Sequence, residues 1–254
     1  MKNNTESQNP YEVRSLARGL RILENVADSP ESQRLTDIAS ALSVDRATAF
    51  RYCSTLTGLG YLHTDPLTKT FTLGPQIRSL GFAAQSKWSW LAVVTKHLPL
   101  IAESHNGAAS FAVLDGTSIL YLDRAVAGKA LNQNISTGDR LPAAQTSIGK
   151  VLLADLTDKD IRDLFKGSLT RQEILTLIEE LEVVRARGWS VNMGNNQPGL
   201  NSVAVPVRDN DSSTLLGGIN FAGSASEMPM KVIRGKVVPL LIEAADMIAT
   251  NQVP

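Results

Sequence analysis

The segment DRATAFRYCSTLTGLGY, residues 45–61, decides the fold of the first third of the chain. Its first residue, an aspartate, is a favoured helix N-cap, and two glycines near its end favour a helix stop. At 100° per residue, Ala49, Cys53 and Leu56 fall on one side of the helix, whereas Arg51 and several small polar side chains fall on the other. The segment therefore predicts a helix with one buried stripe and one exposed face.

Two further helices are predicted before this segment, and a hairpin is predicted after it. Residues 36–42 form the second helix, which a tight turn at 43–44 joins to the third. The β-prone runs at 61–63 and 70–73 flank a short turn segment. The first helix begins at residue 14, and its expected inward stripe comprises Leu16, Leu20, Leu23 and Ala27, widened by Ile22 and Val26. Three helices followed by a hairpin indicate a winged helix-turn-helix.

The remainder of the chain alternates predicted helices and strands. A connecting helix follows the hairpin, and another helix ends near residue 105. Short strands joined by Asp-containing turns favour antiparallel pairing, flanked by helices. The expected strands cover residues 109–114, 119–126, 189–193, 200–207 and 215–221, and the expected helices cover 146–156, 158–165, 171–187 and 231–250. This pattern predicts an α+β domain of the kind that senses small molecules.

Composition narrows the class of protein. The 254 residues are 43% hydrophobic and 20% charged, which is ordinary for a globular protein of one or two domains. The 25 basic and 25 acidic side chains give no net charge, so any binding to nucleic acid must come from the local placement of a few arginines. The chain shows no apolar run long enough for a signal peptide or a membrane span, and we expect a cytoplasmic protein, associated with the nucleoid.

The residues give little support for an enzyme. Cys53 is the single cysteine, so the chain offers neither a disulfide nor a cysteine cluster for a metal. The three histidines, His63, His97 and His105, lack metal-ligand spacing with a second ligand. The Gly-Lys pair ending at Lys150 lacks the other residues of a phosphate-binding loop. We predict no catalytic residue, no metal and no cofactor.

Several motifs together resemble the IclR family of bacterial transcriptional regulators, over essentially everything after residue 14. SLARGL at 15–20 looks like the family's first-helix signature, and LTDIA at 35–39 with the opening segment resembles its helix-turn-helix. In the second half, RLP at 140–142, TSIGK at 146–150 and PGLNSVAVPV at 198–207 resemble the most recognisable motifs of its effector domain. Details such as AVLDG at 112–116 are most similar to the branch that controls aromatic-acid catabolism.

The resemblance implies a fold and a function. Residues 1–13 are expected to be disordered, 14–74 to form the winged helix-turn-helix, 75–87 a linker helix and 88–254 a GAF-like α+β effector-binding domain. Family members bind promoter DNA as homodimers or tetramers, and a small organic acid commonly shifts their activity. We therefore expect a ligand-responsive regulator of a catabolic operon. The alternative is a small-molecule sensor whose DNA-binding half is degenerate and which acts through protein contacts.

The third helix holds most of the candidate DNA contacts. A recognition helix needs small residues for close approach and a donor that reads a base edge or holds a phosphate. The alternative is an ordinary solvated face with one arginine, and for the hairpin an ordinary charged tip. The candidates are Arg46, Ala47, Thr48, Phe50, Arg51 and Thr55 on the helix, with Lys69 on the wing. A two-fold dimer of such domains predicts a pseudo-palindromic operator.

The candidate effector contacts lie in the second half. The family's pocket falls on a helix start near residue 147 and on the strands that follow, where hydroxyl and amide groups suit an anion. Each of these side chains could instead serve only in capping or strand pairing. The candidates are Thr146, Ser147, Ile148, Asn192, Ser202 and Asn220, and Arg124 joins them if its side chain points inward. We expect the ligand to be a small carboxylate, either an aromatic acid or a ring-opened product of one.

Overall fold

The computed structural model describes residues 11–128, 135–194 and 198–250, without the side chains of residues 85–87. Most of the expected disordered segment, 1–13, therefore lies outside the described residues. The chain divides into two compact units, residues 1–87 and 88–254. None of the helices in the described ranges combines the length and the apolar composition that a membrane span requires.

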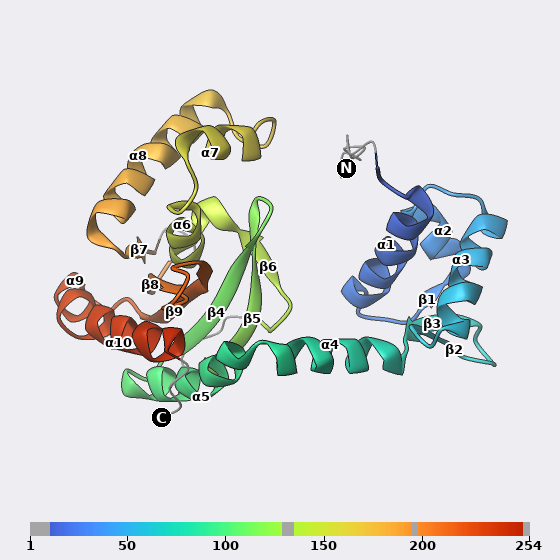
Figure 1. The fold of residues 1–254 in the computed structure, drawn as a ribbon, viewed down its shortest axis with the longest axis horizontal. Helices are drawn as coiled ribbons and strands as arrows, with labels where there is room; N and C mark the ends of the chain where they lie inside the picture. The colour runs from blue at the N-terminus through green and yellow to red at the C-terminus, as the bar shows by residue number, and fades with distance from the viewer. Residues whose placement is uncertain (1–10, 129–134, 195–197, 251–254) are drawn as a thin grey trace. The chain divides into compact units, whose positions relative to one another are not determined.

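The first unit is a winged helix-turn-helix, as the sequence predicts (Figure 1). Its small antiparallel sheet has the strand order β1-β3-β2, and β3 pairs with both neighbours. Strand β1 was not predicted, because it is only two residues long and carries no periodic pattern. The elements are α1 (Arg14–Asp28), β1 (Gln33–Arg34), α2 (Leu35–Ala41), α3 (Arg46–Gly58), β2 (Leu62–Thr64), β3 (Thr70–Leu73) and α4 (Pro75–Lys87).

Fewer side chains of α1 are buried in the core of the first unit than the sequence predicts. Ile22 and Val26 are buried and pack with residues of α2, α3 and the wing. Leu16 and Leu20, expected to face inward, are 63% and 52% exposed. The spacing of apolar residues identifies the apolar face of a helix. It does not say whether the other elements of the same protomer bury all of that face. The prediction that these two leucines are core residues of the protomer is wrong.

The turn between α2 and α3 fixes the helix-turn-helix geometry. Ser43 has a φ of 53°, in the left-handed region that few non-glycine residues adopt. The backbone N–H of Val44 then donates to the carbonyl of Ala39 at 3.0 Å. Asp45 caps α3 by accepting from the backbone N–H of Thr48 at 2.8 Å. These hydrogen bonds fix the short connection between α2 and α3, and they leave the first turn of α3 exposed to solvent.

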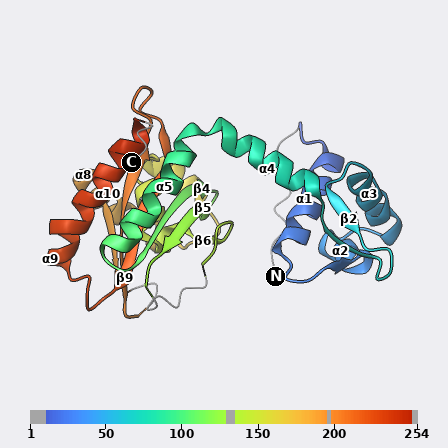
Figure 2. The same cartoon turned by 90° about the horizontal axis from the view of Figure 1, so that it is seen from below.

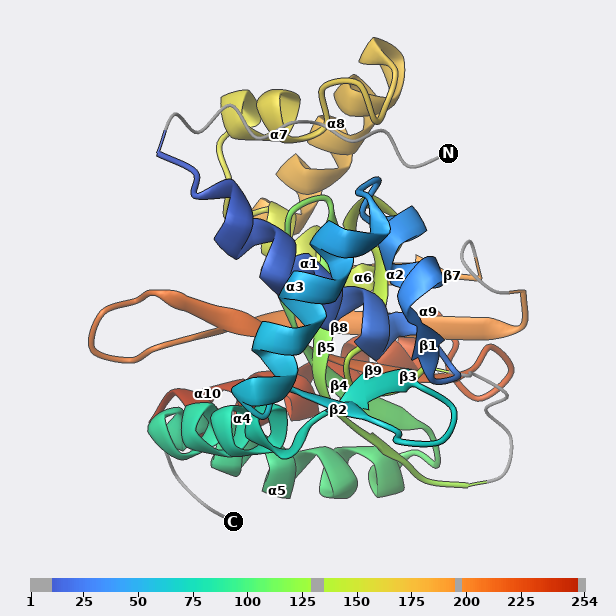
Figure 3. The ribbon, with the colours of Figure 1, turned by 90° about the vertical axis from the view of Figure 1, so that its right-hand side faces the viewer.

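The second unit is built on a six-stranded antiparallel sheet with the order β6-β5-β4-β9-β8-β7. Helices cover both faces: α5 and α10 pack on one, and α6 lies on the other with α7 and α8 above it (Figures 2 and 3). The strands are β4 (Ala108–Asp115), β5 (Ser118–Val126), β6 (Arg140–Pro142), β7 (Ser190–Met193), β8 (Leu200–Arg208) and β9 (Leu215–Ser224). The helices are α5 (Ser89–Ser104), η1 (Ala143–Gln145), α6 (Ser147–Leu153), α7 (Asp158–Leu164), α8 (Arg171–Arg187), α9 (Met230–Val232), η2 (Ile233–Val237) and α10 (Val238–Ala249).

Three details of this unit differ from the sequence prediction. Strand β6 was not expected, because three residues are too few to show alternation. Helix α6 ends at Leu153 rather than at residue 156. The helix expected at 231–250 is divided by η2, which is a turn of π-helix.

The two faces of the large sheet carry different side chains. The face under α5 and α10 is filled by bulky apolar residues, among them Phe111 and Phe221. The face toward α6 carries small or polar residues, because strand alternation sends every second side chain there. These include Ala108, Ser110 and Ala112 on β4, Ala204 and Ser202 on β8, and Gly218, Asn220 and Ala222 on β9. The unit thus has one core of bulky apolar residues and, on the other face of the sheet, small and polar strand residues beneath a second apolar cluster formed largely by α6 and α8.

Candidate functional site

A concave groove of about 920 Å³ opens on the first unit between the start of α3, the start of α2 and the wing. Three cationic side chains, those of Arg34, Arg46 and Lys69, line it, and no carboxylate is among its lining residues in the described chain. The remaining lining residues are Leu35, Thr36, Ala47, Phe50, Thr64, Thr68 and Phe71. A positive concave surface beside an exposed helix start fits a phosphate backbone and the edge of a groove of DNA.

The capping interactions of α3 determine which side chains face this groove. The Thr48 hydroxyl donates to Asp45 at 2.6 Å, so its hydrogen is already engaged in the cap. These hydrogen bonds from Thr48, first through its hydroxyl and then through its backbone N–H, hold the pKa of Asp45 below its ordinary value. The cap is therefore ionised at neutral pH and orients Arg46 and Ala47 outward, where both are exposed.

The wing brings the last predicted DNA contact into the same groove. Asp65 accepts from the backbone N–H groups of Leu67 and Thr68 at 2.7 and 2.9 Å, which closes the tip of the hairpin. These bonds also lower the pKa of Asp65, with the bond from Thr68 as the largest cause. Lys69 follows with a φ of 57°, so its side chain leaves the tip in a direction fixed by the turn.

The groove contains four of the seven predicted DNA contacts and six residues that were not predicted as contacts. Arg46, Ala47, Phe50 and Lys69 line it. Arg51 and Thr55 are exposed on α3 but do not line it, and the Thr55 hydroxyl donates to the carbonyl of Arg51 at 2.9 Å. Thr48 is half-buried. Arg34 and Thr36 were missed because they lie on β1 and the start of a short helix, where no periodic pattern points to an exposed face.

The second candidate site is a row of side chains across the large sheet on the face toward α6. Strand register aligns Arg124 with Ser110, Ser110 with Asn220, Asn220 with Ala204 and Ala204 with Ser190. Because directly opposed residues share a face, all five point the same way. A guanidinium N–H of Arg124 donates to the Ser110 hydroxyl at 3.0 Å, so Arg124 points inward along this row.

Helix α6 meets the same face of the sheet at its start, beside this row. Ser147, the first residue of α6, is buried, and its hydroxyl lies 2.9 Å from that of Ser202 on β8. Thr146 is the N-cap and accepts from the backbone N–H of Gly149 at 2.9 Å. Gly149 lets α6 pack closely against the backbone of Ala143, because a Cβ at residue 149 would lie 2.1 Å from the carbonyl oxygen of Ala143.

The structure therefore gives several predicted effector contacts a structural task. The amide of Asn192 donates to the carbonyl of Gln145 at 2.9 Å and ties β7 to η1. Ile148 is fully buried in the cluster formed by α6 and α8. The hydrogen bonds of Thr146 and Ser147 hold α6 on the sheet. We accordingly assign less of the anion binding to the start of α6, a seven-residue helix, than the sequence suggested.

Arg124, Asn220 and Ser190 are the side chains of the row best suited to a ligand. Burial lowers the pKa of Arg124, and the neighbouring Tyr121 and Asp139 act in the opposite direction, so the guanidinium is a half-buried cation. The Asn220 carboxamide oxygen and the Ser190 hydroxyl are buried, and neither finds a hydrogen-bond partner in the described part of the chain. Buried polar groups are normally satisfied, so these two favour a bound molecule or water.

Two residues of this row, and Tyr121 beside it on β5, were missed from the sequence. Ser110 and Ser190 are buried serines within apolar strands, and Tyr121 is buried two residues after Ile119. A serine that alternates with apolar residues was a usable signal, but it could not be aligned with Arg124 without the register of β4 and β5. Within the described ranges, no three potential metal ligands are grouped closely enough to hold an ion.

Comparison with known proteins places both units. Residues 15–66 match the IclR helix-turn-helix domain, and residues 83–250 match the bacterial transcriptional regulator IclR C-terminal domain. The Pca regulon regulatory protein of Pseudomonas putida is 30% identical over 244 residues, which cover 93% of this chain and 83% of that protein.

Two other similar proteins have names or bound ligands that include aromatic acids. The p-hydroxybenzoate hydroxylase transcriptional activator of Acinetobacter baylyi is 28% identical, over 92% of this chain and 90% of that protein. The crystal structure of an IclR homologue from Microbacterium hydrocarbonoxydans, complexed with 4-hydroxybenzoate, superposes with a TM-score of 0.80. It covers 93% of this chain and 98% of that one at 21% identity, which shows a shared fold.

Proposed function

Because this chain belongs to the IclR family of bacterial transcriptional regulators, we propose that it regulates catabolic genes in response to a small carboxylate. The observation that carries the DNA-binding part is the basic groove at the start of α3, where Arg34, Arg46 and Lys69 meet without an acidic neighbour in the lining. In this proposal the chain acts in the cytoplasm, bound to the nucleoid, and catalyses no reaction.

The groove indicates how DNA is held. Arg46 and Lys69, from α3 and the wing, sit at two edges of the concave surface and contact phosphates. Ala47 lets the helix approach the major groove closely, and Arg51, further along the exposed face, reads a base edge. Phe50, which lines the groove and is 57% exposed, supplies an apolar contact.

We propose that the first units bind DNA as a pair. A single module of this size buries roughly 600–1,000 Å² on DNA, which is marginal for specificity among genomic competitors. Leu16 and Leu20 on α1 and Phe82 on α4 are exposed apolar side chains, and a second copy of this unit would cover them. A two-fold pair predicts a pseudo-palindromic operator with half-sites one helical turn, or a multiple of it, apart.

The effector is proposed to bind on the polar row of the large sheet. Arg124 supplies the countercharge for a carboxylate, and Asn220 and Ser190 supply neutral hydrogen bonds. An amide whose oxygen and nitrogen are distinguished only by hydrogen bonding can present its NH₂ group to an anion after a flip. The small residues of this face, such as Ala108 and Ala222, suit a flat ring. The named regulators of p-hydroxybenzoate and Pca genes, and the homologue complexed with 4-hydroxybenzoate, support an aromatic acid.

The test is a titration of the chain on the DNA upstream of its own gene, by fluorescence anisotropy with excess competitor DNA. Specific binding that survives the competitor, weakens as salt rises and shifts with an aromatic acid is the expected result. Binding that the competitor removes completely would favour the alternative of a sensor acting through protein contacts. Calorimetry with aromatic acids and their neutral amides tests the effector separately, and a preference for the amide would contradict the role of Arg124.

The pairing of first units is tested on the same DNA. Leu20→Glu should lower the molecular mass of the protein in solution and also weaken operator binding. The reason is that a separated protomer can bind only one of the two half-sites. A footprint on a single half-site from the unmodified chain would contradict the pairing.

A further inference from the structure

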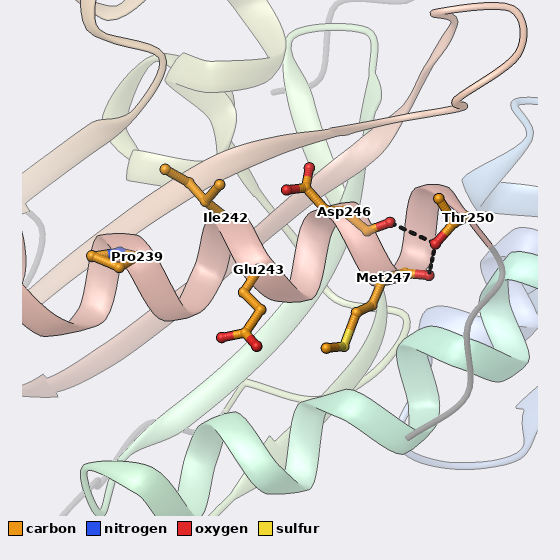
Figure 4. Close-up of a pocket in the computed structure, with 6 residues that line it drawn as sticks. All are labelled: Pro239, Ile242, Glu243, Asp246, Met247 and Thr250. Carbon is orange, nitrogen blue, oxygen red and sulfur yellow. Dashed lines mark hydrogen bonds between the residues drawn. The ribbon is translucent and has the colours of Figure 1, made fainter.

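Two grooves of the described chain place apolar side chains among charged ones, and the charges have opposite signs. The groove of about 580 Å³ along α10, shown in Figure 4, carries Glu243 and Asp246 beside Ile242. These carboxylates would repel a phosphate backbone. In the described chain, the charged side chains that line the groove at the start of α3 are all cationic. An apolar side chain exposed in the second groove is therefore placed to meet nucleic acid.

Phe50 is such a side chain, and its ring is exposed although it is large and apolar. The side chain is 57% exposed, and in the described chain it is not part of the apolar cluster of the first unit, in which Cys53 and Phe71 are buried. It lies on α3 one residue before Arg51, which is also exposed. Packing within the protomer therefore leaves more than half of this side chain available to a ligand.

Ala47 lies beside Phe50 on the surface of α3. Residues three apart are neighbours on a helix, and Ala47 is exposed and lines the same groove. Its short side chain lets the helix approach a base edge closely, and the longer ring of Phe50 then reaches into the same groove of DNA. The two residues form a small apolar surface near the start of α3, which is the part of a recognition helix that contacts base edges.

Two hydroxyl groups of α3 are engaged within the helix. The Thr48 hydroxyl donates to Asp45 at 2.6 Å, and the Thr55 hydroxyl donates to the carbonyl of Arg51 at 2.9 Å. A hydroxyl group has one proton to donate, so neither group in this state donates to an acceptor on a base edge. Recognition at the start of α3 therefore depends more on apolar contact and on arginine than on these threonines.

We propose that Phe50 reads the 5-methyl group of a thymine in each half-site of the operator. In the major groove thymine presents a methyl group, and alanine and phenylalanine are among the side chains that contact it. The cations of the groove hold phosphates, which carry no sequence information, and they bring the ring against the bases. This role of Phe50 rests on the proposed binding to DNA and adds one base, thymine, to the sequence that is read.

The experiment measures how strongly binding depends on the methyl groups of the DNA. The probe is the fragment upstream of the chain's own gene, prepared once with thymidine and once with 2′-deoxyuridine at every thymidine position. Uracil keeps the hydrogen-bonding groups of thymine and lacks the methyl group. The unmodified chain should bind the uracil fragment about fourfold more weakly for each half-site, the scale of burying one methyl group. With both half-sites engaged, the loss should be roughly 15-fold in anisotropy titrations.

Variants of the full chain assign this dependence to Phe50. Phe50→Ala should bind the two fragments within about twofold of each other, because the methyl group then meets no ring. Phe50→Leu should keep most of the preference, since its side chain is still apolar. Leu59→Ala is the matched control, because Leu59 is 59% exposed just after α3 and does not line the groove. Comparing the ratio between variants cancels any effect of uracil on the DNA alone.

A scan of single deoxyuridines locates the thymine. Replacing one thymidine at a time should reveal one position in each half-site, related by the two-fold axis, where binding by the unmodified chain falls about fourfold. The same replacement should leave binding by Phe50→Ala unchanged. At that position 5-methylcytosine should bind the unmodified chain more tightly than cytosine, because its methyl group occupies the same place in the major groove.

Phe50 does not read a methyl group if the unmodified chain binds the thymine and uracil fragments equally, or if Phe50→Ala keeps the full preference. Equal binding is also the result expected of a ring wedged between base steps, since unstacking does not require the methyl group. Failure of the proposed function looks different, because the unmodified chain would then lose the thymine fragment to competitor DNA. Thermal unfolding checks the fold of each variant, and binding to unrelated DNA at low salt should be unchanged, since Arg46 and Lys69 are intact.

Discussion

The two candidate sites place their polar side chains in opposite environments. In the first unit, Arg46 and Lys69 are exposed on the rim of a groove, and each leaves a helix start or a turn. In the second unit, Ser110, Ser190 and Asn220 are buried between a sheet and a helix. An exposed cation can be removed at little expense to the fold, whereas removing the Ser110 hydroxyl would take a hydrogen bond from the half-buried guanidinium of Arg124. The first surface therefore changes its specificity more easily than the second.

The largest effect is expected for Arg124→Gln on effector binding. Removing one partner of a desolvated, hydrogen-bonded charge pair costs about 2–5 kcal/mol, so carboxylate binding should fall by about 30-fold or more in calorimetry. DNA binding without effector should be retained. Arg140→Gln is the matched control, because Arg140 lies on the edge strand and pairs with Asp115 at 2.7 Å. Equal losses in both variants would remove Arg124 from the site.

The contrast between buried and open positions also predicts how two glycine substitutions change the free energy of unfolding. Gly149→Ala should lower the free energy of unfolding by about 1–3 kcal/mol, the usual effect of overpacking, because the new Cβ meets the backbone of Ala143. Gly81→Ala on α4 has open space and should instead stabilise its helix by about 0.5–1 kcal/mol. Urea denaturation measures both. A neutral result for Gly149→Ala would mean that α6 shifts freely on the sheet.

Arg51→Ala should weaken operator binding by about 1–3 kcal/mol, the scale of one good base contact. Arg46→Ala should weaken binding to all sequences alike and reduce the slope of affinity against salt by about one, as expected for a phosphate contact. Arg171→Ala, an exposed arginine of α8, is the control. Anisotropy titrations at several salt concentrations distinguish the roles, and an unchanged affinity for Arg51→Ala would exclude it from base recognition.

The smallest effect concerns Cys53, which reports on the first unit alone. Burial raises the pKa of its thiol from near 9 to about 11, so the reactive thiolate is scarce at neutral pH. Alkylation should be slow in the folded chain and fast in denaturant. Between these pKa values the unfolded chain holds fewer protons, so the contribution of Cys53 to stability is present below pH 9 and is lost as pH rises through about 11. Rapid labelling at pH 8 would show that the first unit opens independently.

The sequence determined those features that depend on neighbours along the chain. The Asp45 cap and the 3.6-residue period fixed α3, its buried Ala49 and Cys53, and its exposed arginines. Alternation and turn residues likewise located the long strands β8 and β9. Such elements are short-range, because their hydrogen bonds and side-chain faces repeat within a few residues.

The tertiary structure decided what depends on register and on contacts between distant segments. Arg124 lies in one row with Ser110 and Asn220 only because β5, β4 and β9 pair in one alignment, and a shift of one residue would turn its side chain to the other face. Arg34 lines the groove from a two-residue strand, which is too short to show an alternating pattern in the sequence. Leu20 is apolar in sequence yet exposed in the protomer, because burial depends on which elements fold against the helix rather than on its own pattern.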